Sequence, residues 1–197
     1  MDYSDNQVTL YTSQSQVVVD QLLQSGRHVV DAAFIKEKYG ETAHVFLQAY
    51  SWYRQHASKI VERPRDADSA IWTFLNAKYL DYSADSRLIK LRVPIEKIVF
   101  FRMSDWNRIL NLRLLGTEEE QVKYSDKLKR YNVDYEGDVY TTAFYPHLKT
   151  ELVCSWQKLF QYDDEIKATK QLPFEDIQGG IWEIQHSWVE SLLEWKI

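Results

Sequence analysis

The chain has 197 residues, of which 45% are hydrophobic and 27% charged, with a formal net charge of -5. This length is most simply one domain, so we expect residues 1–197 to form a single globular unit with its own core. The acidic balance does not favour a general nucleic-acid binder, and no apolar run approaches the roughly 20 residues that a membrane span needs. Cys154 is the only cysteine, so no intrachain disulfide can form, and we expect a cytoplasmic protein.

The first third of the chain predicts one strand and two helices. Residues 8–11 are β-branched and aromatic, which is typical of a strand. Serine and threonine caps then open a helix over residues 17–23, and Gly26 follows where a left-handed C-terminal cap belongs. Residues 41–60 are the longest helical candidate, because their apolar side chains recur at steps of three and four until Pro64 ends the run.

Three further strands are predicted in the middle of the chain. A short extended segment covers residues 69–74 around Trp72, a longer strand covers residues 87–94, and another follows at residues 98–101. Helices are expected after them. Ser104 is predicted to cap one, and Thr117 with the residue three places later forms a capping box that opens a charged, exposed helix.

The last third predicts a helical end to the chain. Residues 134–145 are aromatic and acidic and are expected to be irregular or hairpin-like, and Ser155 is expected to start a short helix. From Pro173 onward the apolar residues follow helical spacing, which predicts a C-terminal helix interrupted at Gly179-Gly180. The order of elements favours an α+β fold, with a small, mostly antiparallel sheet and several packed helices.

Seven tryptophans are the most informative feature of the composition. Each indole needs an apolar wall and a partner for its N–H, which suits a mixed core, a ligand cleft or an interface. Five of them fall on apolar helical stripes and are predicted to be core: Trp52, Trp106, Trp156, Trp188 and Trp195. Trp72 and Trp182 stand beside polar residues, Thr73 and Glu183, and are the first places to look for a site.

Familiar catalytic motifs do not appear in the sequence. The five histidines are scattered and contain no close ligand pair, so no metal site is predicted. No glycine-rich phosphate loop and no nucleophile elbow occurs. Two basic-aromatic clusters could touch nucleic acid, but interleaved acidic residues favour solvated helix faces instead: Lys127, Lys129 and Arg130 with Tyr124 and Tyr131, and Arg54, Lys59, Arg63 and Arg65.

Ordered short segments across most of the chain resemble a bacterial and phage family of domains of unknown function, number 3841. They run from Leu10 to Ser15, from Ala49 to Trp52 and from Ala70 to Trp72, and continue through Leu88–Pro94 and Asp105-Trp106. Later matches are Ser155-Trp156, Ile177-Gln178 and Trp182-Glu183. This family name implies no activity.

A weaker resemblance is to the ADP-ribosyltransferase-like fold. It implies that Tyr11, Thr12, Trp72 and Thr73 bind NAD and that Glu183 is the catalytic carboxylate. A carboxylate stabilises the oxocarbenium character of NAD scission, and aromatic walls can stack on nicotinamide. Two features depart from the pattern: the first strand carries Tyr-Thr in place of the usual Arg or His, and Glu183 falls in a predicted helix.

Three hypotheses of function follow. The first is an ADP-ribosyltransferase-like protein that binds NAD in a Trp- and Tyr-lined cleft and modifies a macromolecule. The second is a non-catalytic interaction protein of a phage or mobile element that binds a host or defence protein, since Trp and Tyr are favoured interface anchors. The third is that the aromatic residues only fill an irregular core. None of the three implies a membrane partner.

Overall fold

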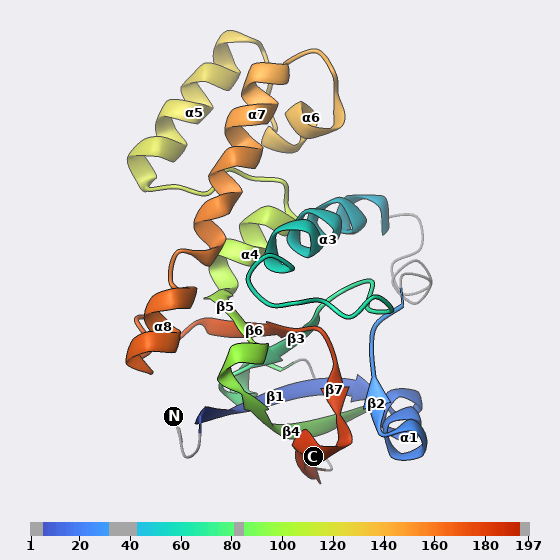
Figure 1. Ribbon diagram of the computed structural model, residues 1–197. Coiled ribbons are helices and arrows are strands. Elements are labelled where there is room, and N and C mark those ends of the chain that lie inside the picture. Colours follow the sequence, from blue (N-terminus) through green and yellow to red (C-terminus); the bar gives the residue numbers. More distant parts are fainter. Residues whose placement is uncertain (1–5, 32–42, 81–84, 194–197) are drawn as a thin grey trace.

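The computed structural model describes residues 6–31, 43–80 and 85–193 (Figure 1). A six-stranded antiparallel sheet forms its centre, in the order β5 (Val99–Arg102), β6 (Ile177–Ile181), β3 (Ile71–Phe74), β1 (Gln7–Ser15), β4 (Ser86–Pro94) and β8 (Val189–Leu193). A small ribbon pairs β2 (Arg27–His28) with β7 (Ile184–Gln185). The expected α+β class with a mostly antiparallel sheet is therefore confirmed.

Helices pack on both faces of the sheet. On one face lie α1 (Gln16–Ser25) and α8 (Asp163–Thr169), and on the other lie α3 (Ala43–Ala57) and α4 (Met103–Leu110). The remaining helices, α5 (Glu118–Arg130), α6 (Glu136–Thr141) and α7 (Pro146–Ser155), extend away from the sheet (Figure 1). Short 3-10 turns are η3 (Ala77–Tyr79), η4 (Ile95–Lys97), η5 (Trp156–Phe160) and η6 (His186–Trp188). The prediction of an irregular segment over residues 134–145 is wrong in part, because α6 lies within it.

Two hydrophobic clusters lie on opposite faces of the sheet. On the first, called the α1 face, Leu10 and Ile89 pack with Leu22 of α1 and Ile166 of α8. The second, called the α3 face, carries a larger, aromatic cluster built from the sheet, α3, α4 and η5. Because side chains alternate along a strand, β3 and β5 contribute to both clusters, whereas the buried apolar side chains of β1 and β4 belong to the α1 face.

The tryptophans belong mainly to these two clusters. Trp52, Trp106, Trp156 and Trp188 are buried as predicted, and Trp182 is buried as well. The Trp156 indole donates to the Arg113 carbonyl oxygen at 2.8 Å, and the Trp182 indole donates to that of Val61 at 3.0 Å. Trp72 is half-buried, and Trp195 lies outside the described residues. Core packing thus accounts for most of the described tryptophans.

The predicted C-terminal helix is wrong, because residues 177–193 form β6, β7, η6 and β8. All five residues of β6 are buried, so this strand lacks the alternation of polar and apolar residues that marks a half-exposed strand. The apolar residues that remain conspicuous in the sequence are Ile177, Ile181 and Ile184, whose steps of four and three residues resemble helical spacing. Sheet pairing decides the outcome, since β6 lies between β3 and β5.

The glycine pair of β6 lets the sheet pack closely on both faces. A Cβ atom on Gly179 would lie 2.8 Å from Cγ2 of Ile98 and 3.0 Å from Oγ1 of Thr73. One on Gly180 would overlap the hydroxyl oxygen of Tyr53, which descends from α3. These glycines are therefore packing positions within a strand and do not interrupt a helix.

One edge of the sheet is closed by a side chain. Asp163, at the start of α8, is 2% exposed and accepts a hydrogen bond from the backbone N–H of Phe100 in β5 at 2.7 Å. Lys167 pairs with its other carboxylate oxygen at 2.7 Å. Burial raises the pKa of Asp163 despite these partners. The edge strand β5 is thus capped from within the chain.

The helices α5, α6 and α7 form a lobe at the end of the molecule away from β1 and β4 (Figure 1). The capping box predicted at Thr117 is present, with both hydrogen bonds to Glu120 made. Tyr124 and Leu128 face inward, and the Tyr124 hydroxyl donates to the Leu148 carbonyl oxygen of α7 at 3.0 Å. The charged helix is therefore anchored to α7 on one side and exposed on the other.

Candidate functional site

The two threonines predicted to bind NAD are buried within the sheet. The Thr12 hydroxyl donates to the Trp72 carbonyl oxygen at 3.1 Å, and the Thr73 hydroxyl donates to the Gly179 carbonyl oxygen at 2.8 Å. Their side chains are 1% and 0% exposed. Both hydroxyls thus stabilise the contacts between neighbouring strands.

The predicted site residues divide between the two faces of the sheet. Tyr11 pairs with Phe74 across β1 and β3, which places Tyr11 and Trp72 on the α3 face and Thr12 and Thr73 on the α1 face. The Trp72 ring packs among rings of α3 and α4, with centroid distances of 4.8 to 5.5 Å to Trp106, Tyr53 and Tyr50. One ligand lying on a single face of the sheet could not contact all four side chains.

Glu183 lies between β6 and β7 and not in a helix, so that expectation is wrong. Its carboxylate forms an ion pair with Arg27 of β2 and accepts a hydrogen bond from the Gln185 amide at 2.8 Å. Arg27 also pairs with Asp66 at 2.7 Å. The hydrogen bonds that Arg27 donates to Asp66 and, next in effect, to Glu183 raise the pKa of its guanidinium, and the bond from Arg27 lowers the pKa of Asp66. This network ties three separate segments of the chain together.

A groove of about 390 Å³ lies in the lobe, away from these residues. Its floor is Leu114, Leu115 and Ser155. Ser155 accepts a hydrogen bond from the Leu115 backbone N–H at 2.9 Å, and Glu136 accepts one from that of Leu114 at 2.6 Å. Because these N–H groups are satisfied and Leu114 and Leu115 are only 4% and 2% exposed, the floor offers a ligand little beyond its shape.

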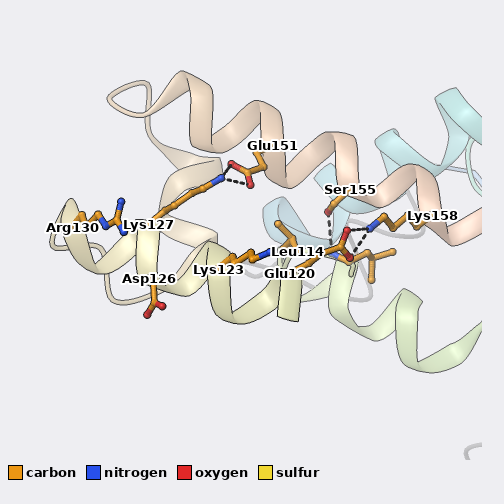
Figure 2. A pocket seen from close by; sticks show the side chains of 10 residues that line it. Leu114, Glu120, Lys123, Asp126, Lys127, Arg130, Glu151, Ser155 and Lys158 are labelled. Carbon is orange, nitrogen blue, oxygen red and sulfur yellow. Dashed lines mark hydrogen bonds and ion pairs between the residues drawn. The ribbon is translucent and has the colours of Figure 1, made fainter. Parts of the chain in front are cut away.

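Charged side chains form the walls of this groove, where α5 faces α7 and η5 (Figure 2). Figure 2 shows Lys127 reaching toward Glu151 and Lys158 toward Glu120, each pair at 2.7 Å. The hydrogen bond from Lys158 lowers the pKa of the Glu120 carboxyl. Arg130 lines the end of the groove, and no ion-pair partner for it lies among residues 6–31, 43–80 and 85–193.

Aromatic residues gather at the tip of the lobe, next to that end of the groove. Tyr131 follows Arg130, and its ring lies 5.5 Å from that of Tyr145 and 5.4 Å from that of His147. Phe144 is 85% exposed and Tyr131 is 45% exposed. We call the groove together with Tyr131, Phe144, Tyr145 and His147 the groove–tip surface.

Sequence reasoning points to part of this surface. The pattern of Lys127, Lys129, Arg130 and Tyr131 favours a solvated helix face. The aromatic character of residues 134–145 is also visible in the sequence, but not the exposure of Phe144 or its position beside Tyr131. Aromatic residues in such a segment could be buried in a core or exposed on a surface, and only the three-dimensional structure distinguishes these two cases.

A sequence profile for a domain of unknown function, DUF3841, matches residues 9–190. The chain belongs to the DUF3841 family. No curated protein and no solved structure matches it. The family assignment confirms the first resemblance and carries no activity with it.

Among the residues that the structure describes, no group of three or more His, Cys, Asp or Glu side chains is arranged to hold a metal ion. Over the same part of the chain, no helix has the length and apolar character to cross a bilayer.

Proposed function

We propose that this member of the DUF3841 family is a protein-binding module that recognises its partner through the groove–tip surface. The observation that carries the proposal is the exposure of Phe144 and Tyr131 beside a groove that ends at Arg130. Tyrosine, other aromatic residues and arginine dominate the binding energy of protein interfaces. A monomeric surface rarely exposes such residues together without a partner.

The architecture of the lobe supports this proposal. The Tyr145 hydroxyl donates to the Tyr131 carbonyl oxygen at 3.4 Å, which holds the start of α7 against the end of α5. The ion pair of Lys127 with Glu151 also joins these two helices. A surface held in place before binding loses little conformational entropy when its partner arrives.

The test is capture of partners by the purified protein from lysate of the cells that carry its gene. Tyr131→Ser and Phe144→Ser remove the exposed rings, and we expect each to release a partner that the unchanged chain holds. Val17→Ser and Leu23→Ser are matched controls, because these residues are 74% and 58% exposed but lie on α1. A partner retained by both tip variants, or lost equally in the controls, would overturn the proposal.

ADP-ribosyl transfer is a second proposal, favoured by one observation. Glu183 follows a strand, as the resemblance to the ADP-ribosyltransferase-like fold implies, and its side chain is 16% exposed. NAD binding is then expected to involve Glu183 with the half-buried Tyr11 and Trp72.

Titration calorimetry with NAD tests this second proposal. We expect binding that weakens in Glu183→Gln and persists in Glu190→Gln, a matched change on β8. Absence of heat with NAD at millimolar concentration, or equal binding by both variants, would remove the enzyme hypothesis. Unfolding curves of the two variants show whether loss of the Arg27 pair has disturbed the fold.

A further inference from the structure

Helix α5 carries a ridge with opposite charges at its two ends, which runs from Glu118 to Asp126 and Arg130 at the rim of the groove. Glu118, Val122, Asp126 and Arg130 are spaced four residues apart, which places them along one i±4 ridge of the helix. All four are exposed, and Val122 is 55% exposed. Its two ends are separated by 12 steps along the chain, or about 18 Å along the helix axis.

Only the two ends of this ridge lack a partner in the part of the chain that is described. Asp126 pairs with Lys129 at 3.0 Å, and the other charges of α5 pair as Glu119 with Lys123, Glu120 with Lys158 and Lys127 with Glu151. Glu118 and Arg130 form no ion pair with residues 6–31, 43–80 or 85–193. The centre of the ridge is therefore neutral, with one carboxylate at its start and one guanidinium at its end.

We propose that a second copy of this chain docks antiparallel on α5, so that Glu118 of each copy pairs with Arg130 of the other. A twofold axis through the middle of the ridge makes both pairs at once, because such an interface presents the same patch on both copies. Val122 then becomes covered near the axis. Two copies of the ridge bring opposite charges together only when they run antiparallel, since a parallel arrangement would place Glu118 against Glu118 and Arg130 against Arg130.

This inference concerns association between copies of the chain; it shares Arg130 with the groove–tip surface, but its test reads the oligomeric state and not partner capture. Helix α5 lies at the outer border of the lobe, with α7 on its other side (Figure 1). One helix face is smaller than the roughly 800 Å² per partner of specific interfaces, so we expect the association to be weak and transient. Because exposed charges carry the contact, association weakens as salt is added.

Sedimentation equilibrium of the full chain, from about 5 μM to about 1 mM, tests the proposal. Glu118→Arg alone and Arg130→Glu alone each replace two attractive contacts by two repulsive ones. We expect each to raise the dissociation constant by about tenfold or more. The double variant E118R/R130E restores both pairs with exchanged partners, and its dissociation constant should return to within about threefold of the original.

The double variant also separates docking from helix stability. Both of its charges oppose the helix macrodipole, so its α5 is intrinsically the least stable of the set. Recovery of the dimer can then come only from contacts between copies. Glu96→Arg, on exposed η4, makes the same change in net charge and should leave association unchanged.

A chain that stays monomeric to about 1 mM would overturn the proposal. So would a double variant as weak as the two single ones, or a control that weakens association as much as Glu118→Arg. Circular dichroism of each variant confirms that α5 and the rest of the fold are intact.

Discussion

Gly180→Ala should destabilise the protein because its new methyl group meets the buried hydroxyl of Tyr53. The added Cβ overlaps that oxygen and lies 3.0 Å from Cζ of the ring. Neither side can yield easily, since Tyr53 is 1% exposed and Gly180 pairs with both Trp72 and Val99. Overpacking a core costs about 1–3 kcal/mol, and the lost freedom of glycine returns about 0.4–1 kcal/mol.

The expected net loss is therefore about 1–2 kcal/mol of unfolding free energy, or about 2–8 °C in Tm for a chain of this size. The Tyr53 hydroxyl has no hydrogen-bond partner among the described residues. Tyr53→Phe should consequently be neutral or stabilising by about 1 kcal/mol, since it removes a buried, unsatisfied polar group. In the Tyr53→Phe background the hydroxyl oxygen is gone, and the atom nearest to the new methyl group is Cζ of the ring at 3.0 Å. Gly180→Ala should therefore lower the unfolding free energy less in that background than in the unchanged chain.

Urea denaturation followed by far-UV circular dichroism measures all four proteins of this double-mutant cycle. The coupling energy between the two changes should favour the double variant by about 1 kcal/mol. The packing argument is wrong if Gly180→Ala is as stable as the unchanged chain, or if Tyr53→Phe brings no relief to it.

Further substitutions test other contacts by the same denaturation assay. Tyr124→Phe should lower the unfolding free energy by about 1 kcal/mol, because the Tyr124 hydroxyl donates a hydrogen bond to the Leu148 carbonyl oxygen. Tyr53→Phe loses no such bond, so equal changes in stability for the two variants would contradict this reasoning. Thr117→Ala should cost about 1 kcal/mol through the capping box, and Thr142→Ala, outside any such box, should cost less. Burial lowers the pKa of His28, so the unfolded chain takes up a proton below about pH 6.5 while the folded chain does not. Stability should therefore fall as pH drops below that value, and His28→Gln should flatten this part of the profile; an unchanged profile would exclude His28 as its source.

Local signals predicted the elements that local forces dominate. Gly26 adopts φ 76 as the left-handed cap of α1, and the Thr117 capping box forms as its spacing indicates. The strand expected at residues 87–94 is β4, and the longest predicted helix is α3, although it ends at Ala57, well before Pro64. Each of these elements is determined mainly by residues that lie close together in the sequence, and short sequence patterns detect such local interactions.

Long-range contacts decided what the sequence could not show. Strand β6 was hidden because its neighbours bury both of its faces, and its glycines are explained only by Tyr53 and Ile98 arriving from elsewhere. The position of Glu183 outside a helix follows from the same pairing. Alternation along β1 and β3 places the side chains of Thr12 and Trp72 on opposite faces of the sheet, and this placement depends on a strand register that residue spacing alone does not fix.

The strand order has a consequence for how the chain folds as it leaves the ribosome. Strand β5 joins the rest of the sheet only through β6, which is synthesised about 75 residues later. Until residue 181 has emerged, β3 and β5 each present an unpaired edge, and the aromatic rings of α3 lack part of the floor that they pack on. Early release of the nascent chain, or loss of its last twenty residues, would leave a sheet in two pieces with exposed edges that invite aggregation.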